Sequence, residues 1–154
     1  MNIQYLSTPV GRLVLGADDS GICWLRPGDA PSGAQLVQTP LLQTASIQLE
    51  EYFAGRRKDF ELPLSLSGTP FQRACWDALC AIPYGETRTY AQQAAAVGNP
   101  KACRAVGMAN HVNPVIILVP CHRVIGSNGR LTGYACGLSL KQFLLDLEAS
   151  HRTK

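Results

Sequence analysis

The 154-residue chain has no apolar run that approaches the roughly 20 residues of a membrane-spanning helix. It has no CxxC pair, and its first 68 residues contain one cysteine and no histidine, so a structural zinc site is not expected. Residues 1–4 show neither the basic flank nor the apolar core of a secretion signal. These absences predict a cytoplasmic protein whose six scattered cysteines are reduced thiols.

Charged residues make up only 16% of the chain, against 46% hydrophobic residues, a balance typical of globular proteins rather than disordered ones. The charges are unevenly placed. Residues 1–68 carry five basic and seven acidic side chains (−2), whereas residues 69–154 carry nine basic and four acidic ones (+5). The asymmetry fits a polyanion-binding domain beside a mildly acidic one, although ordinary surface scatter explains it about as well.

The first 68 residues alternate short β-type runs with turn residues. The pattern predicts strands over 2–7, 11–17 and 21–25, a loop over 26–40, a helix over 41–54 and an extended segment over 60–64. Leu66–Pro70 has the composition of a linker. We therefore predict two domains, at residues 1–68 and 69–154.

Beyond the linker the pattern becomes helical. Thr69 is expected to cap a helix with Pro70 at its first position, and Thr89–Gln92 is a capping box that opens an alanine-rich helix ending at Gly98. Asn99 is expected to cap a third helix over 100–110. A last helix is predicted over 138–148, with an inward face of Leu140, Phe143, Leu144 and Leu147.

Two short helices joined by a Gly-Asn turn are typical of a helix-turn-helix motif. The second helix would present Lys101 and Arg104 on a surface of small residues, which allows close approach to nucleic acid. A plain αα-hairpin without a ligand is the alternative, and DNA binding is the favoured interpretation. Asn128-Gly129, followed by Arg130, predicts a tight hairpin turn further along the chain.

The apolar run 115–119, closed by Pro120, predicts a buried strand that ends at Cys121 and His122. A nucleophilic cysteine needs such a neighbour, because the thiolate is the reactive form and a base or cation generates it. The alternative is a cysteine that serves only as a small buried hydrophobe. Neighbouring side chains on a strand point apart, so either the chain turns sharply at Pro120 or a water bridges the pair. A distant carboxylate would have to orient the imidazole.

These motifs together resemble the O6-alkylguanine-DNA alkyltransferases, also called methylated-DNA–protein-cysteine methyltransferases. The resemblance is close over 69–148 and looser over 1–68. Its markers are Pro-Phe-Gln-Arg at 70–73, Ile-Pro-Tyr-Gly-Glu-Thr at 82–87, Tyr-Ala-Gln-Gln at 90–93, Arg-Ala-Val-Gly at 104–107, Asn-Pro at 113–114, Pro-Cys-His-Arg-Val at 120–124, Gly-Tyr at 133–134 and Lys-Gln-Phe-Leu-Leu at 141–145. It implies an α+β protein with an N-terminal ribonuclease-H-like α/β domain and a C-terminal, mostly helical winged-helix/helix-turn-helix domain.

The resemblance also implies direct-reversal DNA repair. The alkyl group of O6-methylguanine in duplex DNA would pass irreversibly to Cys121, in a single turnover with base flipping; O4-methylthymine is left open as a second substrate. No cofactor and no metal are needed, because the damaged DNA is the alkyl donor. We expect a monomer that binds the minor groove without sequence specificity, and leave cooperative binding open.

Residue roles follow from the same resemblance. Cys121 corresponds to the acceptor, His122 to a base acting through a water, Glu148 to the carboxylate that orients His122, and Asn113 to a hinge. The expected DNA-binding residues are Arg104, which fills the gap left by the flipped base, Tyr90, which crowds the adjacent phosphate, and Lys101, Ala102, Ala105, Gly107 and Arg130. The expected substrate-binding residues are Tyr134, whose hydroxyl donates to the guanine, the backbone near Val124 and Ala135, and Cys136.

Two residues call for comment beside those roles. Cys136 stands where the family usually has glycine, and we expect it to narrow the pocket and slow transfer from bulky O6-benzyl adducts. Arg123 is expected to be structural and to bridge the two domains.

Three rival functions are weighed. A non-enzymatic damage-binding protein of the alkyltransferase-like type would lack the acceptor, and Cys121 argues against it. A transcription regulator would need base-reading side chains, which the alanine-rich helix has few of. A cysteine hydrolase would need an oxyanion hole and an open cleft, and would turn over repeatedly on an ester substrate.

Overall fold

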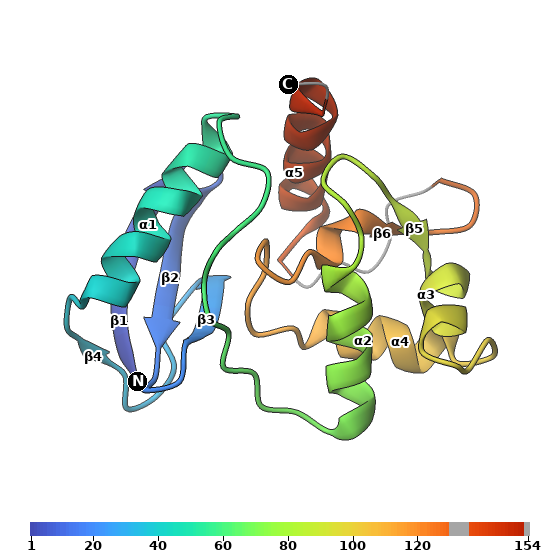
Figure 1. The fold of residues 1–154 in the computed structure, drawn as a ribbon, viewed down its shortest axis with the longest axis horizontal. Helices are drawn as coiled ribbons and strands as arrows, with labels where there is room; N and C mark the ends of the chain where they lie inside the picture. The colour runs from blue at the N-terminus through green and yellow to red at the C-terminus, as the bar shows by residue number, and fades with distance from the viewer. Residues whose placement is uncertain (130–135, 153–154) are drawn as a thin grey trace. The chain divides into compact units, whose positions relative to one another are not determined.

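The computed structural model describes residues 1–129 and 136–152. The chain divides into two compact units, Met1–Ser67 and Gly68–Lys154, which are considered separately (Figure 1). No helix among the described residues is both long enough and apolar enough to cross a membrane.

The first unit is a four-stranded sheet covered by one helix (Figure 1). Its elements are β1 (Asn2–Thr8), β2 (Gly11–Ala17), β3 (Ile22–Pro27), β4 (Gln35–Leu36) and α1 (Pro40–Phe53). The sheet order is β3-β2-β1-β4. Strand β2 pairs antiparallel with both β1 and β3, and β4 pairs parallel with β1. Leu42, Leu49 and Tyr52 of α1 are fully buried, as are Leu13 and Leu15 of β2, so a hydrocarbon core forms between helix and sheet.

The three strands and the helix predicted here are confirmed to within two residues. The predicted loop over 26–40 is wrong at β4, a two-residue strand whose side chains are both exposed and therefore leave no alternating pattern. The predicted extended segment over 60–64 pairs only at Leu64, which bridges to Ile22, the first residue of β3.

The second unit is mostly helical. Its elements are α2 (Pro70–Cys80), β5 (Arg88–Thr89), α3 (Tyr90–Ala96), α4 (Cys103–His111), the 3₁₀ turn η1 (Cys121–Arg123), β6 (Val124–Ile125) and α5 (Leu138–His151). β5 and β6 pair in parallel. The caps predicted at Thr69 and Thr89 are confirmed, and each is a full capping box with Gln three residues on.

Helices α2, α3 and α4 enclose a small core of Cys75, Ala94, Val106 and Ala109. Polar groups inside it are paired. Gln93 Nε2 donates to Asn110 Oδ1 at 2.9 Å, Asn110 Nδ2 donates back to Gln93 Oε1 at 2.7 Å, and Gln93 Nε2 also reaches the Cys75 carbonyl at 3.1 Å. This network fixes the packing of α3 against α4, because each amide satisfies the other in a dry interior.

The predicted start of the third helix is wrong. Helix α4 begins at Cys103 with Ala102 at its N-cap, and no side chain caps it. Asn99 belongs instead to the turn that leaves α3: its N–H donates to Ala94, and its carbonyl accepts from the Ala102 N–H at 3.0 Å. The Asn-Pro pair resembles a cap in sequence, but its backbone closes a turn before the helix.

The apolar run 115–119 is buried as predicted, but it is not a strand. Its residues form tight turns, with the Leu118 N–H donating to Ile116 at 2.8 Å and the Val119 N–H donating to Val115 at 3.1 Å. Ile117 has φ +74°, the only positive φ outside glycine among the described residues. A β-branched residue is strongly disfavoured there, so this backbone is held under strain.

Candidate active site

Cys121 lies directly after these turns. The chain bends sharply at Pro120, where the Cys121 N–H donates to the Val119 carbonyl at 2.8 Å, and then enters η1. This is the first of the two arrangements the sequence allowed. Cys121 and His122 therefore lie in a 3₁₀ turn, and the opposite-face rule of a strand does not apply to them. The Cys121 side chain is buried, with 5% of its surface exposed.

Asn113 holds this turn and contacts the thiol. Its Nδ2 donates to the Val119 carbonyl at 2.8 Å and to Cys121 Sγ at 3.2 Å, while its Oδ1 accepts from the Val115 N–H at 2.9 Å. One buried amide thus joins both ends of the strained segment to the sulfur. A hydrogen bond donated to sulfur favours the thiolate over the thiol.

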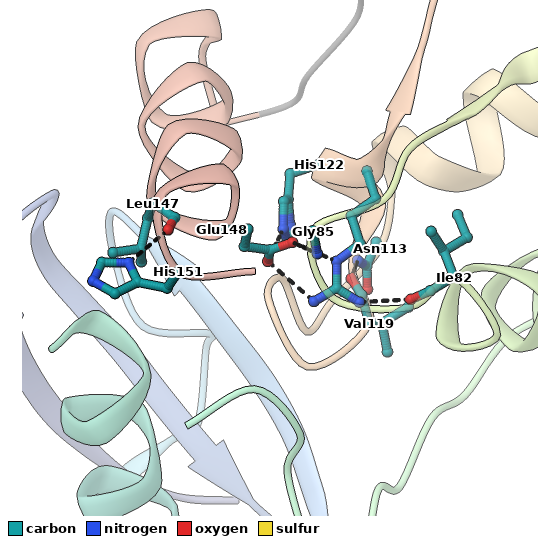
Figure 2. Close-up of polar contacts among 9 residues, drawn as sticks. Ile82, Gly85, Asn113, Val119, His122, Leu147, Glu148 and His151 are labelled. Carbon is teal, nitrogen blue, oxygen red and sulfur yellow. Dashed lines mark hydrogen bonds and ion pairs between the residues drawn. The ribbon is translucent and has the colours of Figure 1, made fainter. Parts of the chain in front are cut away.

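His122 and Glu148 form a buried pair between η1 and α5 (Figure 2). His122 Nε2 and Glu148 Oε2 are 2.7 Å apart, and the two side chains are 0% and 1% exposed. Arg123 donates to the same carboxylate, through Nε to Oε1 at 2.8 Å and through Nη2 to Oε2 at 3.0 Å. The Gly85 N–H adds a fourth contact, at 3.2 Å from Oε1.

The charge states follow from these contacts. Burial alone would raise the pKa of Glu148, but the hydrogen bond with His122 and the Arg123 guanidinium outweigh it and lower that pKa to about 2. Burial lowers the pKa of His122; Glu148 opposes this change, and the charges of Arg123 and Lys141 add to it. The pair is therefore an ionised carboxylate beside a neutral imidazole at neutral pH.

An ionised carboxylate only accepts, so His122 Nε2 must carry the hydrogen. Nδ1 is then the basic nitrogen, and it is buried with no hydrogen-bond partner among the described residues. An unpaired buried acceptor beside a thiol can take up a proton, either directly or through a water. The described residues contain no group of three or more histidine, cysteine or acidic side chains that could hold a metal.

The outer face of α4 is basic and made largely of small residues. Arg104, Ala105 and Met108 are exposed, as is Lys101 in the turn before the helix. Gly107 is half-buried, and a Cβ there would meet the Tyr90 ring at 3.9 Å, an ordinary contact. Two further residues predicted to bind DNA, Ala102 at the N-cap of α4 and Tyr90 in α3, are half-buried and pack against the three-helix core.

Both units match models of a single protein family. Residues 1–66 match the ribonuclease-like domain and residues 70–150 the DNA binding domain of 6-O-methylguanine DNA methyltransferase. The chain belongs to the 6-O-methylguanine DNA methyltransferase family. This confirms the resemblance inferred from the motifs and the two-domain α+β class.

Relatives of this methyltransferase chain match over nearly its full length. A methylated-DNA–protein-cysteine methyltransferase of Methanosarcina acetivorans is 49% identical over 158 residues, 97% of this chain and 99% of the relative. The constitutive enzyme of Bacillus subtilis is 50% identical over 150 residues, 92% and 91% of the two chains. The solved structure of Mycobacterium tuberculosis OGT in complex with DNA superposes with a TM-score of 0.92 at 43% identity, covering 98% and 94%.

The structure places the other predicted methyltransferase site residues as follows. Val124 is buried in β6, and Cys136 is half-buried in the turn before α5. The Gly129 N–H donates to the Gly126 carbonyl at 2.9 Å, which closes a turn with Ser127 and Asn128 at its centre, one residue earlier than the expected Asn-Gly turn. Arg130, Tyr134 and Ala135 lie outside the described residues.

Sequence reasoning missed one buried charge of the methyltransferase. Lys141 is 1% exposed, and its Nζ lies 5.9 Å from the centroid of the Tyr90 ring. Burial lowers the pKa of Lys141, and the nearby Cys121 opposes that change. The expected inward face of α5 held Phe143 and Leu147, but these are half-buried while Lys141 and Glu148 are buried. The seven-residue spacing between Lys141 and Glu148, two helical turns, was the available signal.

Arg123 also differs from expectation. It was predicted to bridge the two domains, but its hydrogen bonds go to Glu148 and, through Nη1 at 2.7 Å, to the Ile82 carbonyl. Both partners lie in the second unit. Its structural role is therefore inside the site itself.

Proposed function

We propose that this protein repairs O6-alkylguanine in duplex DNA by moving the alkyl group to its own Cys121, once per molecule. The coarse activity, methyl transfer from DNA to a protein cysteine, follows from family membership. The finer proposal is supported by one observation above all: the buried Cys121 adjoins an imidazole whose Nδ1 has no partner among the described residues, while Nε2 is held by Glu148.

The chemistry follows from those contacts. His122 Nδ1 accepts the Cys121 proton through a water, and Asn113 stabilises the developing negative charge on Sγ. The sulfur attacks the alkyl carbon in line, the carbon–O6 bond breaks, and its electron pair stays on the guanine oxygen. A donor to the leaving guanine is required, and the Tyr134 hydroxyl is the proposed one.

A single turnover follows from the product. The alkyl group ends in a carbon–sulfur thioether bond, which the amide, imidazole and carboxylate around Cys121 have no means of cleaving. The reaction consumes one protein molecule for each adduct. A hydrolase mechanism would instead pass through a thioester that water opens, and the protein would be recovered.

DNA is the partner, as in the solved complex of the Mycobacterium tuberculosis relative. The exposed Arg104 and Lys101 make the α4 face a candidate binding surface, and its small residues suit a narrow minor groove. Because a base inside a duplex is out of reach of a buried sulfur, the target must be flipped out. Arg104 would occupy the gap in the stack.

Intact-mass measurement with peptide mapping tests this proposal. The protein is mixed with a duplex that carries one O6-methylguanine, beside a Cys121→Ser variant and an undamaged duplex. We expect one added methyl group on Cys121, saturating at one per protein, and none on the variant. No transfer with retained binding to the damaged duplex would mean a damage sensor, and repeated turnover on an ester would favour a hydrolase. A duplex carrying O4-methylthymine tests the second substrate in the same way.

A further inference from the structure

The Arg123 side chain is buried and fixed by hydrogen bonds from three of its nitrogens. The side chain is 8% exposed, and the three nitrogens donate as follows: Nε and Nη2 to the two oxygens of Glu148, and Nη1 to the Ile82 carbonyl. A guanidinium matches a carboxylate in this two-pronged geometry, and a lysine cannot reproduce it. The arginine thus fixes the plane of the carboxylate that contacts His122.

The sharing of that carboxylate links Arg123 to the reaction. Glu148 Oε2 contacts both His122 Nε2, at 2.7 Å, and Arg123 Nη2, at 3.0 Å. A lone buried carboxylate would draw a proton onto the imidazole and leave an imidazolium, which cannot act as a base. A guanidinium on the same oxygen opposes this, because a second positive charge beside the first is unfavourable.

Other charged groups also face His122, and each acts in a definite direction. Lys141 on α5 adds a second cation and lowers the pKa of His122, whereas the Glu148 carboxylate on the same helix raises it. Cys121 precedes His122 in η1 and carries the proton to be moved. Tyr84, in the turn before β5, lies against Arg123, with the guanidinium carbon 5.7 Å from the ring centroid.

We propose that Arg123 is a positioning residue of the transfer reaction: its guanidinium orients Glu148 against His122 and keeps His122 in the neutral, proton-accepting form. This inference rests on the proposed function and deepens it. The contacts described for Arg123 are with Glu148, the Ile82 carbonyl and the Tyr84 ring, so we infer that it acts through the His122–Glu148 pair. Its removal should therefore change the pH at which transfer fails, and not only the rate.

The test is the single-turnover transfer rate from O6-methylguanine duplex measured from pH 5 to 9. Arg123→Lys keeps the positive charge but loses the two-pronged contact with the carboxylate. The transfer rate should therefore fall about tenfold, while the pH at which the rate drops on the acid side (the acid limb) stays the same. Arg123→Gln loses the charge, so the pKa of His122 rises and the acid limb should move up by about one pH unit. Circular dichroism and binding to damaged duplex confirm that each variant is folded.

A purely structural arginine gives a different result: both variants would lose rate equally at every pH, and the proposal would be overturned. Should Arg123→Gln fail to fold, a ¹⁵N-histidine NMR titration of the unaltered protein tests the protonation state that the proposal requires. His122 should titrate below its ordinary pKa, and titration at or above that pKa would contradict the proposal. That titration needs no transfer, so it stays informative even if the repair function proves wrong.

Discussion

The two units of the chain differ in what they bury. In Met1–Ser67 the core is hydrocarbon, and the one polar side chain buried among its residues is Gln48. The described part of Gly68–Lys154 buries seven polar or charged side chains: Gln93, Asn110, Asn113, His122, Arg123, Lys141 and Glu148. Burying an ionisable group costs free energy unless the group is paired. A cluster of buried ionisable groups is therefore typical of a functional site.

Two ion pairs make this contrast testable. Arg123–Glu148 in the second unit is 8% and 1% exposed, whereas Arg57–Glu51 in the first unit is 26% and 34% exposed. Glu148→Ala leaves a buried guanidinium and an unsupported imidazole, and should lower the free energy of unfolding by about 3–5 kcal/mol. Glu51→Ala should cost under about 1 kcal/mol. Urea unfolding followed by circular dichroism measures both.

The two variants should differ as clearly in activity. Glu148→Ala is expected to abolish methyl transfer at neutral pH, because His122 loses its orienting carboxylate, and Glu51→Ala should leave the rate unchanged. Equal unfolding free energies for the two variants would break the comparison. Such a result would mean that the buried ion pair contributes no more to the free energy of unfolding than the half-exposed pair.

Lowering the pH should destabilise the second unit before the first. Glu148 has its pKa lowered from 4.5 to about 2, so the unfolded chain binds that proton at higher pH than the folded one. Stability is then fully present above pH 4.5 and lost as pH falls toward 2, by about 3 kcal/mol in all. His122, whose pKa is also lowered, begins the loss below pH 6.5. Hydrogen exchange at pH 7, 5 and 4 should show protection falling first in α5 and η1, and not in β1–β3.

The sequence could predict most elements of the first unit and the start of the second, since their signals are local. The Thr69 and Thr89 caps and the alternating strands need no distant partner to be recognised. The run 115–119 could not be predicted, because a buried β-branched segment becomes a strand only where another strand pairs with it. Among the described residues of this unit, β5 and β6 have two residues each and pair with one another, and within the run 115–119 Val115 alone makes a bridge.

The candidate site divides in the same way. Cys121 and His122 stand out because they are adjacent after an apolar run, and Asn113 and Glu148 entered only through the family resemblance. The partner of Arg123 and the burial of Lys141 were not foreseen. A charged residue in a sequence is presumed to be solvated, and only the fold shows which charges face inward.

Two buried glutamines offer a comparison within the cores. Gln48 in the first unit exchanges hydrogen bonds with the backbone of Glu61, and Gln93 in the second bonds Asn110 and the Cys75 carbonyl. Either change to alanine should cost about 1–3 kcal/mol, because a buried group loses its partner. Gln93→Ala should also weaken duplex binding about tenfold, since it frees α4 from α3, while Gln48→Ala should leave binding unchanged. Fluorescence anisotropy with a labelled duplex distinguishes them.

The smallest expected difference concerns surface charge. Lys101, exposed before α4, and Arg56, exposed after α1, each carry one positive charge. If the α4 face contacts phosphates, the Lys101→Ala variant releases one counterion fewer from the DNA when it binds. The slope of log affinity against log salt concentration should then become shallower by about 0.9. Arg56→Ala should leave the slope unchanged, because the acidic first unit is not expected to face DNA. Equal changes of slope in the two variants would show that positive charge in both units acts on the DNA. The two units would then differ in the residues that they bury but not in their contribution to DNA binding.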